Sequence, residues 1–321
     1  MATSPGSAGA PARQHAIAAA IGLVLAGLAF AAEPAAPRIT PRMLLLDGAL
    51  AGSDIIAVGE RGTLVRSRDQ GASWQRLSSP TRATLTGVSF ATLAAPRLGW
   101  AVGHDALILA TTDGGQTWVK QFQGENLQDS FLDVLALDAQ RVIAVGAYGL
   151  ALVTTDGGRS WEKRKVTDDD PHLNRITRGP SGTLYLAGER GTLLRSADRG
   201  ETWQRLAAPY EGSFYGVLPL DGRRLIAHGL RGHVYHSADD GASWRLITTP
   251  EPALLATAIK VKGDQLVFAG QARVLLVSRD HGQTVVSATG ALATGVAELL
   301  ELPDGRLLAL GEAGATILSQ P

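Results

Sequence analysis

The chain has 321 residues, 45% of them hydrophobic, and its formal net charge is zero, with 30 basic and 30 acidic residues. This apolar content is sufficient for a large core, and the lack of a basic excess argues against nucleic acid as a partner. The local basic run Lys163-Arg164-Lys165 has no interleaved aromatic residues and is expected to be a solvated strand end. No Cys is present, which excludes disulfides, thiol nucleophiles and Cys-based metal sites.

The N-terminal segment differs in kind from the rest of the chain. Arg13 and His15 precede an apolar run over residues 16–30, which ends in Ala29-Phe30-Ala31. This pattern predicts a secretory signal peptide over residues 1–31, cleaved after Ala31, followed by one domain over residues 32–321. The run is shorter than the roughly 20 residues that span a bilayer, so a retained anchor is the less favoured alternative. We therefore expect an exported, periplasmic protein that meets a membrane through its partner.

An eight-residue phrase, Ser/Thr-x-Asp-x-Gly-x-Ser/Thr-Trp, recurs along the chain and is known as an Asp-box. From Asp to Asp the steps are 44, 43, 42, 41 and 41 residues. A sixth copy starts at Asp280 and has Val285 where the others have Trp. The five complete copies carry Asp69 and Trp74, Asp113 and Trp118, Asp156 and Trp161, Asp198 and Trp203, and Asp239 and Trp244.

A second signature, an apolar strand that ends in Gly, precedes each box. Repeats of about 40 to 45 residues with four short strands each are typical of propeller blades, whereas helical repeats need long stretches of 3.6-residue periodicity. The sequence therefore predicts an all-β, seven-bladed β-propeller of four-stranded antiparallel blades, with Met43–Leu46 in the innermost strand of the first blade. The seven anchors are Gly59, Gly103, Gly146, Gly188, Gly229, Gly270 and Gly311.

Each Asp-box is expected to be structural. Its Asp can accept hydrogen bonds from backbone N–H groups of its own turn, its Gly can take a positive φ, and its Trp can fill the gap between blades. One carboxylate per turn is too few for Ca²⁺, which takes six to eight oxygen ligands. We expect neither a metal nor a cofactor.

The seventh unit is incomplete, because the sequence from Leu307 to Ser319 stops before an Asp-box and an outer strand. The segment Pro37-Arg38-Ile39-Thr40-Pro41 is similar to the outer strands of other units. We expect this N-terminal strand to close the ring by pairing with the last blade.

These motifs resemble one family in particular. Seven units, the strand Gly99-Trp100-Ala101-Val102-Gly103 and Thr-Thr-Asp-Gly-Gly boxes at Asp113 and Asp156 are similar to the photosystem II assembly and stability factors, over residues 38–319. The resemblance implies a lumenal or periplasmic propeller that acts as a chaperone-like scaffold for a membrane complex. It also implies a non-catalytic binding ring, with no small-molecule substrate.

Asp-boxes also occur in sialidases, so a glycosidase or a glycan-binding protein is the alternative. A sialidase site needs three Arg, a Tyr–Glu pair and an Asp. Only Arg38-Ile39 resembles part of it, and the five Tyr offer no such pair. Such an enzyme should show three Arg and two carboxylates at its centre, whereas a scaffold should show small apolar residues of the innermost strands. The sequence favours the latter at Val88, Val134, Val217 and Val296.

Other candidates for chemistry are weak. The run Asp168-Asp169-Asp170 near His172 could supply general acid–base groups, but an acidic run before Pro is usually a solvated loop. The remaining histidines lie at non-equivalent places and predict no metal cluster: His104, His228, His233, His236 and His281. No catalytic residue is predicted.

Propeller topology places the turns between second and third strands on one face with the loops between blades, and the Asp-boxes on the other. Arg61, Arg190 and Arg231 recur at one position of these turns. Arg and Tyr are enriched in protein interfaces, so we expect a monomer that binds periplasmic segments of a membrane-protein complex, such as a photosystem or an exporter, there. Alternatively, Glu60-Arg61 and Glu189-Arg190 merely solvate their turns, with local pairing worth under about 1 kcal/mol each. The predicted partner-binding residues are Arg61, Arg66, His104, Tyr148, Arg190, Arg195, Arg231 and Tyr210.

Overall fold

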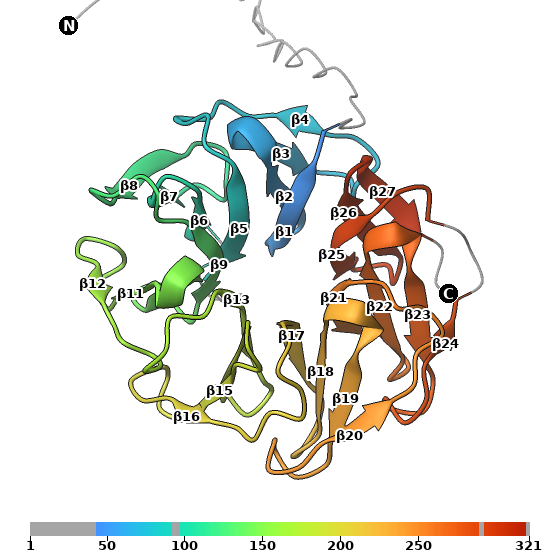
Figure 1. Ribbon diagram of the computed structural model, residues 1–321. Helices are drawn as coiled ribbons and strands as arrows, with labels where there is room; N and C mark the ends of the chain where they lie inside the picture. The colour runs from blue at the N-terminus through green and yellow to red at the C-terminus, as the bar shows by residue number, and fades with distance from the viewer. Residues whose placement is uncertain (1–42, 92–94, 96, 289–291, 319–321) are drawn as a thin grey trace, which may run out of the picture. The chain divides into compact units, whose positions relative to one another are not determined.

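The computed structural model describes residues 43–91, 95, 97–288 and 292–318. The chain divides into two units, Met1–Ala36 and Pro37–Pro321, and the described residues all belong to the second. They form seven antiparallel sheets around a central axis (Figure 1), six with four strands and one with three. The predicted seven-bladed propeller is confirmed. The predicted signal peptide and closing strand lie outside the described residues.

Within each blade the strands run from the centre outward in chain order. Blade 1 consists of β1 (Leu45–Ala51), β2 (Asp54–Gly59), β3 (Thr63–Ser67) and β4 (Gln75–Arg76). Blade 2 consists of β5 (Leu85–Phe90), β6 (Gly99–Gly103), β7 (Leu107–Thr111) and β8 (Val119–Gln123). Blade 3 consists of β9 (Phe131–Ala136), β10 (Val142–Gly146), β11 (Ala151–Thr154) and β12 (Glu162–Lys163).

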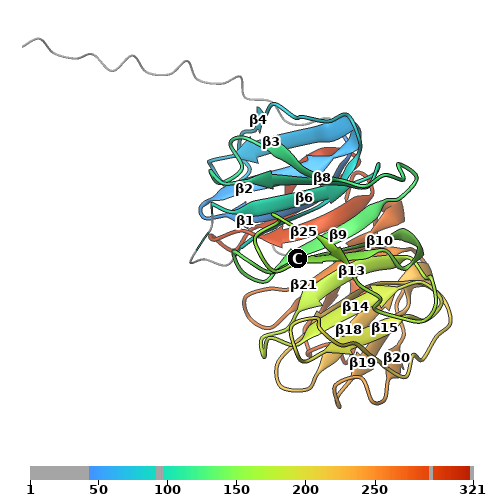
Figure 2. The ribbon, with the colours of Figure 1, turned by 90° about the vertical axis from the view of Figure 1, so that its left-hand side faces the viewer.

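Blades 4 to 7 repeat this order, and the side view of Figure 2 shows the blades following one another around the ring. Blade 4 consists of β13 (Leu173–Arg178), β14 (Leu184–Gly188), β15 (Leu193–Ser196) and β16 (Gln204–Arg205). Blade 5 consists of β17 (Phe214–Pro219), β18 (Leu225–Gly229), β19 (Val234–Ser237) and β20 (Arg245–Ile247). Blade 6 consists of β21 (Leu255–Lys260), β22 (Leu266–Gly270), β23 (Leu275–Ser278) and β24 (Val286–Ser287). Blade 7 consists of β25 (Val296–Glu301), β26 (Leu307–Gly311) and β27 (Gly314–Leu318).

The hydrophobic core lies in the gaps between blades. The described residues contain seven apolar clusters, one for each pair of neighbouring blades. The cluster that joins blade 7 to blade 1 includes Leu45, Trp74 and Leu308. Trp74 and Trp118 are buried. Trp161, Trp203 and Trp244 are half-buried and pack against the clusters that join blades 2 and 3, blades 3 and 4, and blades 4 and 5, respectively. The predicted role of the box Trp as an apolar plate between blades is therefore confirmed.

The recurrent Gly that ends each second strand has a steric cause. The innermost strand crosses so closely that a Cβ on Gly59 would lie 2.0 Å from the carbonyl oxygen of Leu44. At Gly270 the corresponding distance to the Leu254 oxygen would be 1.8 Å. Next to these crossings every innermost strand has a β-bulge, which adds one residue opposite its partner. Only Gly allows this approach, which explains the seven anchors.

The Asp-box turns have the predicted geometry. In the box of blade 5, Asp239 accepts hydrogen bonds from the backbone N–H and the hydroxyl of Ser243, at 2.8 and 2.6 Å. The hydroxyl of Ser237 donates to Asp239 and accepts from the N–H of Gly241, both at 2.8 Å. The hydrogen bonds from Ser243, followed by that from Ser237, lower the pKa of Asp239 to about 2. The carboxylate therefore acts as the acceptor that organises its own turn.

Blade 7 ends at β27, whose outer side has no partner strand among the described residues. The innermost strand of blade 1 begins later than predicted, at Leu45 rather than Met43, and extends to Ala51. Within the ranges that the structure describes, no helix has the length and apolar character needed to cross a membrane.

Candidate functional site

In blades 1 to 6 the turn between the second and third strands holds a non-Gly residue in the left-handed backbone region. The turn η1 (Glu60–Gly62) has Arg61 at φ 54°, and η2 (Ala147–Gly149) has Tyr148 at φ 54°. The turn η3 (Leu230–Gly232) has Arg231 at φ 58°, and the equivalent Arg190 of blade 4 has φ 52°. In blade 6, η4 (Gln271–Arg273) has Ala272 at this position. Each left-handed residue costs about 1 kcal/mol or more where Gly would fit, so a retained side chain suggests a use.

The three turn arginines are exposed and form no ion pair with any residue that the structure describes. Tyr148 is 70% exposed, and its ring lies edge-on to His172 with 4.8 Å between the ring centroids. We name the surface formed by Arg61, Tyr148, Arg190 and Arg231 the turn face. It presents three guanidinium groups and one phenol to solvent.

The glutamates beside these arginines have another role. Glu60 accepts a hydrogen bond from the N–H of Leu44 at 3.2 Å. Glu189 accepts one from the N–H of His172 at 3.3 Å, and Glu312 of blade 7 does the same for Gly295 at 3.2 Å. The glutamates therefore tie their turns to the innermost strands. No ion pair joins Glu60 to Arg61 or Glu189 to Arg190 among the described residues, so the local pairing is not observed. Solvation of the turns by the exposed arginines remains the alternative to partner binding.

The opposite face provides an internal comparison. Four left-handed residues with side chains occur in the described Asp-box turns: Gln70, Arg199, Asp240 and His281. Two of them, Arg199 with φ 63° and Asp240 with φ 65°, form ion pairs. There Arg199 pairs with Asp138 of blade 3, and Asp240 accepts from Tyr185 and pairs with Arg195 at 2.9 Å. These side chains hold neighbouring blades together. Those of the turn face have no such partner within the described protein.

Two predicted partner-binding residues, Arg66 and Arg195, do not belong to the turn face. Each is followed directly by the Ser that opens an Asp-box, so it lies at the other end of its strand. Arg66 pairs with Asp54 at the start of β2, and Arg195 pairs with Asp240. Both bind within the protein, so their prediction as partner-binding residues is not supported by their position.

The remaining predicted residues differ in exposure. His104 is exposed in the turn of blade 2, next to Asp105, which has φ 61°. Tyr210 is half-buried in the loop before blade 5, with its ring centroid 4.3 Å from that of His233 and 6.0 Å from that of Phe214. Tyr210 therefore packs against rings of blade 5 more than it presents a free surface.

The centre of the ring differs from both predicted patterns. Arg175 of blade 4 pairs with Glu298 of blade 7, and its guanidinium lies 3.7 Å from Asp47 and 3.9 Å from Asp133. This set of one Arg and three carboxylates, the central cluster, has the opposite charge balance to a sialidase triad of three Arg. The four predicted valines do not line the centre, because Val88, Val134, Val217 and Val296 pack in the gaps between blades.

Burial changes the acidity of the central carboxyl groups. It raises the pKa of Asp133 to about 6, against the lowering effect of Arg175. Burial and the neighbouring Glu298 raise the pKa of Asp47 well above its usual value. His228 faces the same region, and burial lowers its pKa to about 4, so its imidazole is neutral near pH 7.

Sequence reasoning missed the central cluster, although a signal exists. Asp47, Asp133, Arg175 and Glu298 each precede the anchor Gly of their blade by 12 or 13 residues. The predicted set of central valines treats Val296 as the equivalent of Val134. In the structure, however, Asp133 lies opposite Val145 and Glu298 lies opposite Leu310, so the bulges make Glu298 the equivalent of Asp133. The register shift of the bulge is not visible in the sequence alone.

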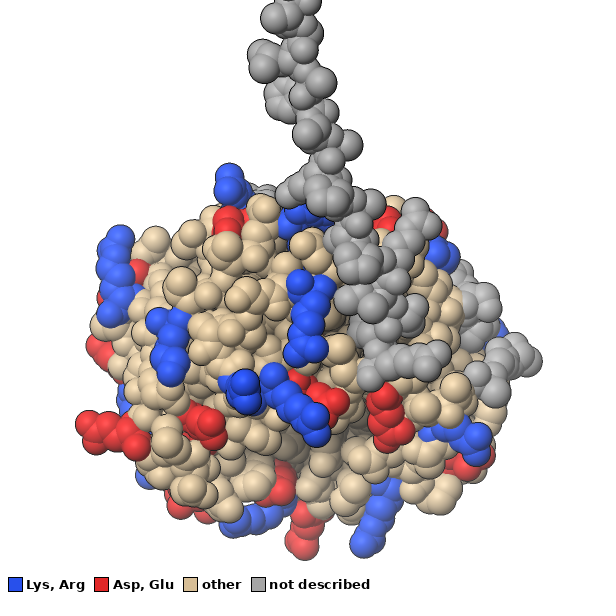
Figure 3. All heavy atoms as spheres, turned by 90° about the horizontal axis from the view of Figure 1, so that it is seen from above, with Lys and Arg blue, Asp and Glu red and all other residues tan. Residues whose placement is uncertain are grey.

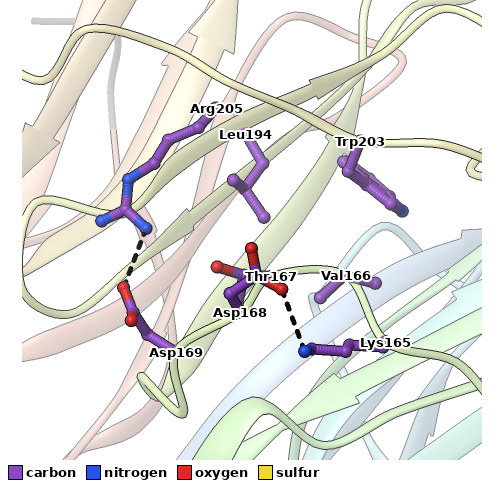
Figure 4. A pocket seen from close by; sticks show the side chains of 8 residues that line it. All are labelled: Lys165, Val166, Thr167, Asp168, Asp169, Leu194, Trp203 and Arg205. Carbon is purple, nitrogen blue, oxygen red and sulfur yellow. Dashed lines mark hydrogen bonds and ion pairs between the residues drawn. The ribbon is translucent and has the colours of Figure 1, made fainter.

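The acidic loop of residues 168–170 borders a cavity of about 570 Å³ between the loop and blade 4. Figure 4 shows Trp203 and Leu194 on one side of it and two ion pairs on the other. Lys165 pairs with Asp168 at 2.9 Å, and Arg205 pairs with Asp169 at 3.2 Å. The carboxylates are thus engaged by cations of the same loop and of β16, as expected for a solvated loop.

Charge on the outer surface is mixed. The edge of the propeller seen in Figure 3 carries Lys and Arg side chains interspersed with Asp and Glu. Among the described ranges, no group of three His, Cys, Asp or Glu side chains is arranged to hold a metal ion. The turn face is therefore distinguished by exposed arginines in the left-handed backbone region rather than by a large single-sign surface.

A family model and a curated relative match parts of this sequence. The family model described as "Photosynthesis system II assembly factor YCF48" matches residues 67–163 and 121–252. The chloroplastic photosystem II stability/assembly factor HCF136 of Cyanidioschyzon merolae is 35% identical over 81 residues. That segment is 24% of this chain and only 18% of the length of HCF136.

Solved structures of low identity agree in fold. The structure described as "YCF48 bound to D1 peptide" has a TM-score of 0.73 and 23% identity, and the match covers 88% of this chain and 96% of that chain. YCF48 from Cyanidioschyzon merolae has a TM-score of 0.72 at 15% identity, covering 88% and 97%. The WD40 propeller domain of Doa1 has a TM-score of 0.67 at 13% identity, and the match covers 88% of this chain and 97% of that chain. Because the family model spans residues 67–252, more than half of the sequence, this chain belongs to the photosynthesis system II assembly factor YCF48 family.

Proposed function

We propose that the chain is a non-catalytic scaffold that binds a segment of a membrane-protein subunit at its turn face, and that it acts in the assembly or stability of that complex. The observation that carries the proposal is the contrast between its two faces. Among the described residues of the Asp-box face, the left-handed Arg199 and Asp240 form ion pairs within the protein. The left-handed Arg61, Arg190 and Arg231 are exposed and form no ion pair with a described residue. Arg and Tyr at such positions suit recognition of an acidic or polar peptide.

The relatives support a peptide partner. HCF136 is named as a photosystem II stability/assembly factor, and one similar structure holds a D1 peptide. By analogy, we propose that the client of this chain is a D1-like membrane subunit. The central cluster favours a scaffold over a sialidase-type enzyme, because it offers one Arg to three carboxylates where an anionic sugar would need several cations.

The test is the affinity of the full chain for a synthetic D1 peptide, measured by fluorescence anisotropy. The variant Arg61→Gly/Arg190→Gly/Arg231→Gly should bind at least tenfold more weakly, because three charges are lost from the turn face. The matched control Arg68→Ala/Arg159→Ala/Arg279→Ala removes three exposed arginines of the Asp-box turns that form no ion pair with a described residue and should bind as the unmodified chain does. Equal affinity of all three proteins, or loss in the control alone, would contradict the proposed face.

We also propose that residues 1–31 direct export to the periplasm and that the propeller is a monomer. The apolar run of residues 16–30 before Ala31 supports export. N-terminal sequencing of the protein from a periplasmic extract should begin at Ala32, and light scattering should give the mass of one chain. An N-terminus at residue 1 in a membrane fraction would indicate a retained anchor instead.

A further inference from the structure

The seven innermost strands each present one equivalent position to the centre of the ring, directly after the bulge. Three of these positions are acidic, one is basic and three are uncharged. Together they form a complete ring of equivalent residues, of which only the charged ones can respond to pH. They are Asp47, Gly87, Asp133, Arg175, Gly216, Thr257 and Glu298.

Arg175 connects blades that are not neighbours. It donates to Glu298, 123 residues further along the chain, and lies within 3.9 Å of Asp47 and Asp133. These residues belong to blades 4, 7, 1 and 3, and Figure 1 shows β13 and β25 on different sides of the centre. The guanidinium is thus a direct polar link across the ring.

Each carboxylate also holds a neighbouring blade. Asp47 accepts a hydrogen bond from the N–H of Val88 at 2.7 Å, and Asp133 accepts one from the N–H of Ile176 at 2.9 Å. Glu298 accepts one from the hydroxyl of Thr257 at 3.0 Å. Any change in the charge of the cluster therefore acts on the contacts between blades.

The charges of the cluster do not balance. Three ionised carboxylates around one guanidinium leave two surplus negative charges in a buried site, where like charges repel strongly. Two further titratable groups beside the described cluster, His228 and Tyr215, are neutral near pH 7. The imidazole of His228 fills the space beside Gly216, where a Cβ would lie 2.4 Å from Nε2, and burial keeps it uncharged at neutral pH. Burial also raises the pKa of Tyr215 at the bulge of β17.

We propose that the central cluster is a proton-linked latch. One proton taken up by the carboxylates around Arg175 reduces their mutual repulsion and strengthens the links between blades, and its release near neutral pH weakens them. The raised pKa of Asp133, about 6, supports release in this range. For a pKa raised on folding, stabilisation is complete below the unfolded value near 4 and is lost as the pH rises through 6.

The test compares the unfolding constant of the full chain with that of Asp133→Asn in urea between pH 4 and pH 7.5. The ratio of the two constants, unmodified over variant, should rise by up to about tenfold per pH unit between pH 4 and 6 and then level off. Contributions of His228, His233 and His236, whose lowered pKa values act in the opposite sense, are common to both proteins and cancel in the ratio.

The matched control is Asp138→Asn, which changes a half-exposed carboxylate that pairs with Arg199 and has a lowered pKa. Its ratio should be constant above pH 4.5. A constant ratio for Asp133→Asn as well would overturn the proposal. Should that variant not fold, the carboxyl ¹³C resonances of the unmodified chain are followed as the pH changes. At least one carboxyl group must titrate above pH 5. Titration of every carboxyl group below pH 5 would overturn the latch.

Discussion

The guanidinium of Arg175 on β13 donates to the carboxylate of Glu298 on β25, three blades further along the chain. The chain has no Cys, so no disulfide joins its blades. Apolar contacts between neighbours hold the ring locally, and this ion pair adds a polar link between distant blades. The centre of the ring is therefore occupied by a structural charge cluster, and the exposed turns remain for a partner.

The left-handed arginines of the turn face are predicted to cost stability. Arg231→Gly should leave the free energy of unfolding unchanged or raise it by up to about 1 kcal/mol, because Gly relieves the positive φ while losing more entropy on folding. The control Arg245→Gly, at an exposed strand position of β20 without positive φ, should lower it by roughly 0.5 to 1 kcal/mol. Urea denaturation measures both variants. If Arg231→Gly lowered the free energy of unfolding as much as Arg245→Gly does, the backbone at Arg231 would not be strained.

The buried hydroxyl of each Asp-box should matter more than the exposed one. Ser237→Ala leaves the N–H of Gly241 without its acceptor, so the free energy of unfolding should fall by about 1 to 3 kcal/mol. Ser243→Ala removes an exposed donor to Asp239 and should cost less than about 1 kcal/mol. Thermal unfolding followed by circular dichroism compares the two, and the reverse order would contradict the hydrogen-bond pattern.

The fold was predictable because its repeat is local. The period of the Asp-boxes and the anchor glycines set the number of blades, and the box contacts join residues two to four positions apart, such as Asp239 and Ser243. The position of Arg231 on the turn face follows from propeller topology, because the turns between second and third strands of all blades lie on the same face. By contrast, the central cluster depends on bulges that shift the register and on contacts such as Arg175 to Glu298. Nothing in a single sequence indicates which distant blades these side chains will meet.

The Asp-boxes predict loss of stability in strong acid. Hydrogen bonds from Ser243 hold the pKa of Asp239 at about 2, and the pKa values of Asp69, Asp113, Asp156 and Asp198 are lowered in the same way. A lowered pKa gives stabilisation that is complete above the unfolded value near 4 and is lost as the pH falls toward 2. The melting temperature should therefore drop between pH 4 and pH 2, and less so in Asp239→Asn. A melting temperature that is constant over this range would refute the assignment.

Closure of the ring by the N-terminal segment remains a prediction. The outer side of β27 has no partner strand among the described residues, and Thr316 on it is exposed. Because the chain has no Cys, a pair of introduced cysteines reports on proximity without competing thiols. Ile39→Cys with Thr316→Cys, or with the adjacent Ile317→Cys, should form an intramolecular disulfide on oxidation. Ile39→Cys with Val286→Cys on β24 of blade 6 is the control and should remain reduced; oxidation of the control alone would place the segment elsewhere.

The most direct test of the account is amide hydrogen exchange of the full chain with and without a bound D1 peptide. The account predicts slower exchange in the presence of the peptide at the turns of residues 60–62, 147–149, 189–191 and 230–232, with little change at the Asp-box turns. Protection confined to the Asp-box turns, or to the cavity beside residues 165–169, would contradict the turn face as the partner site.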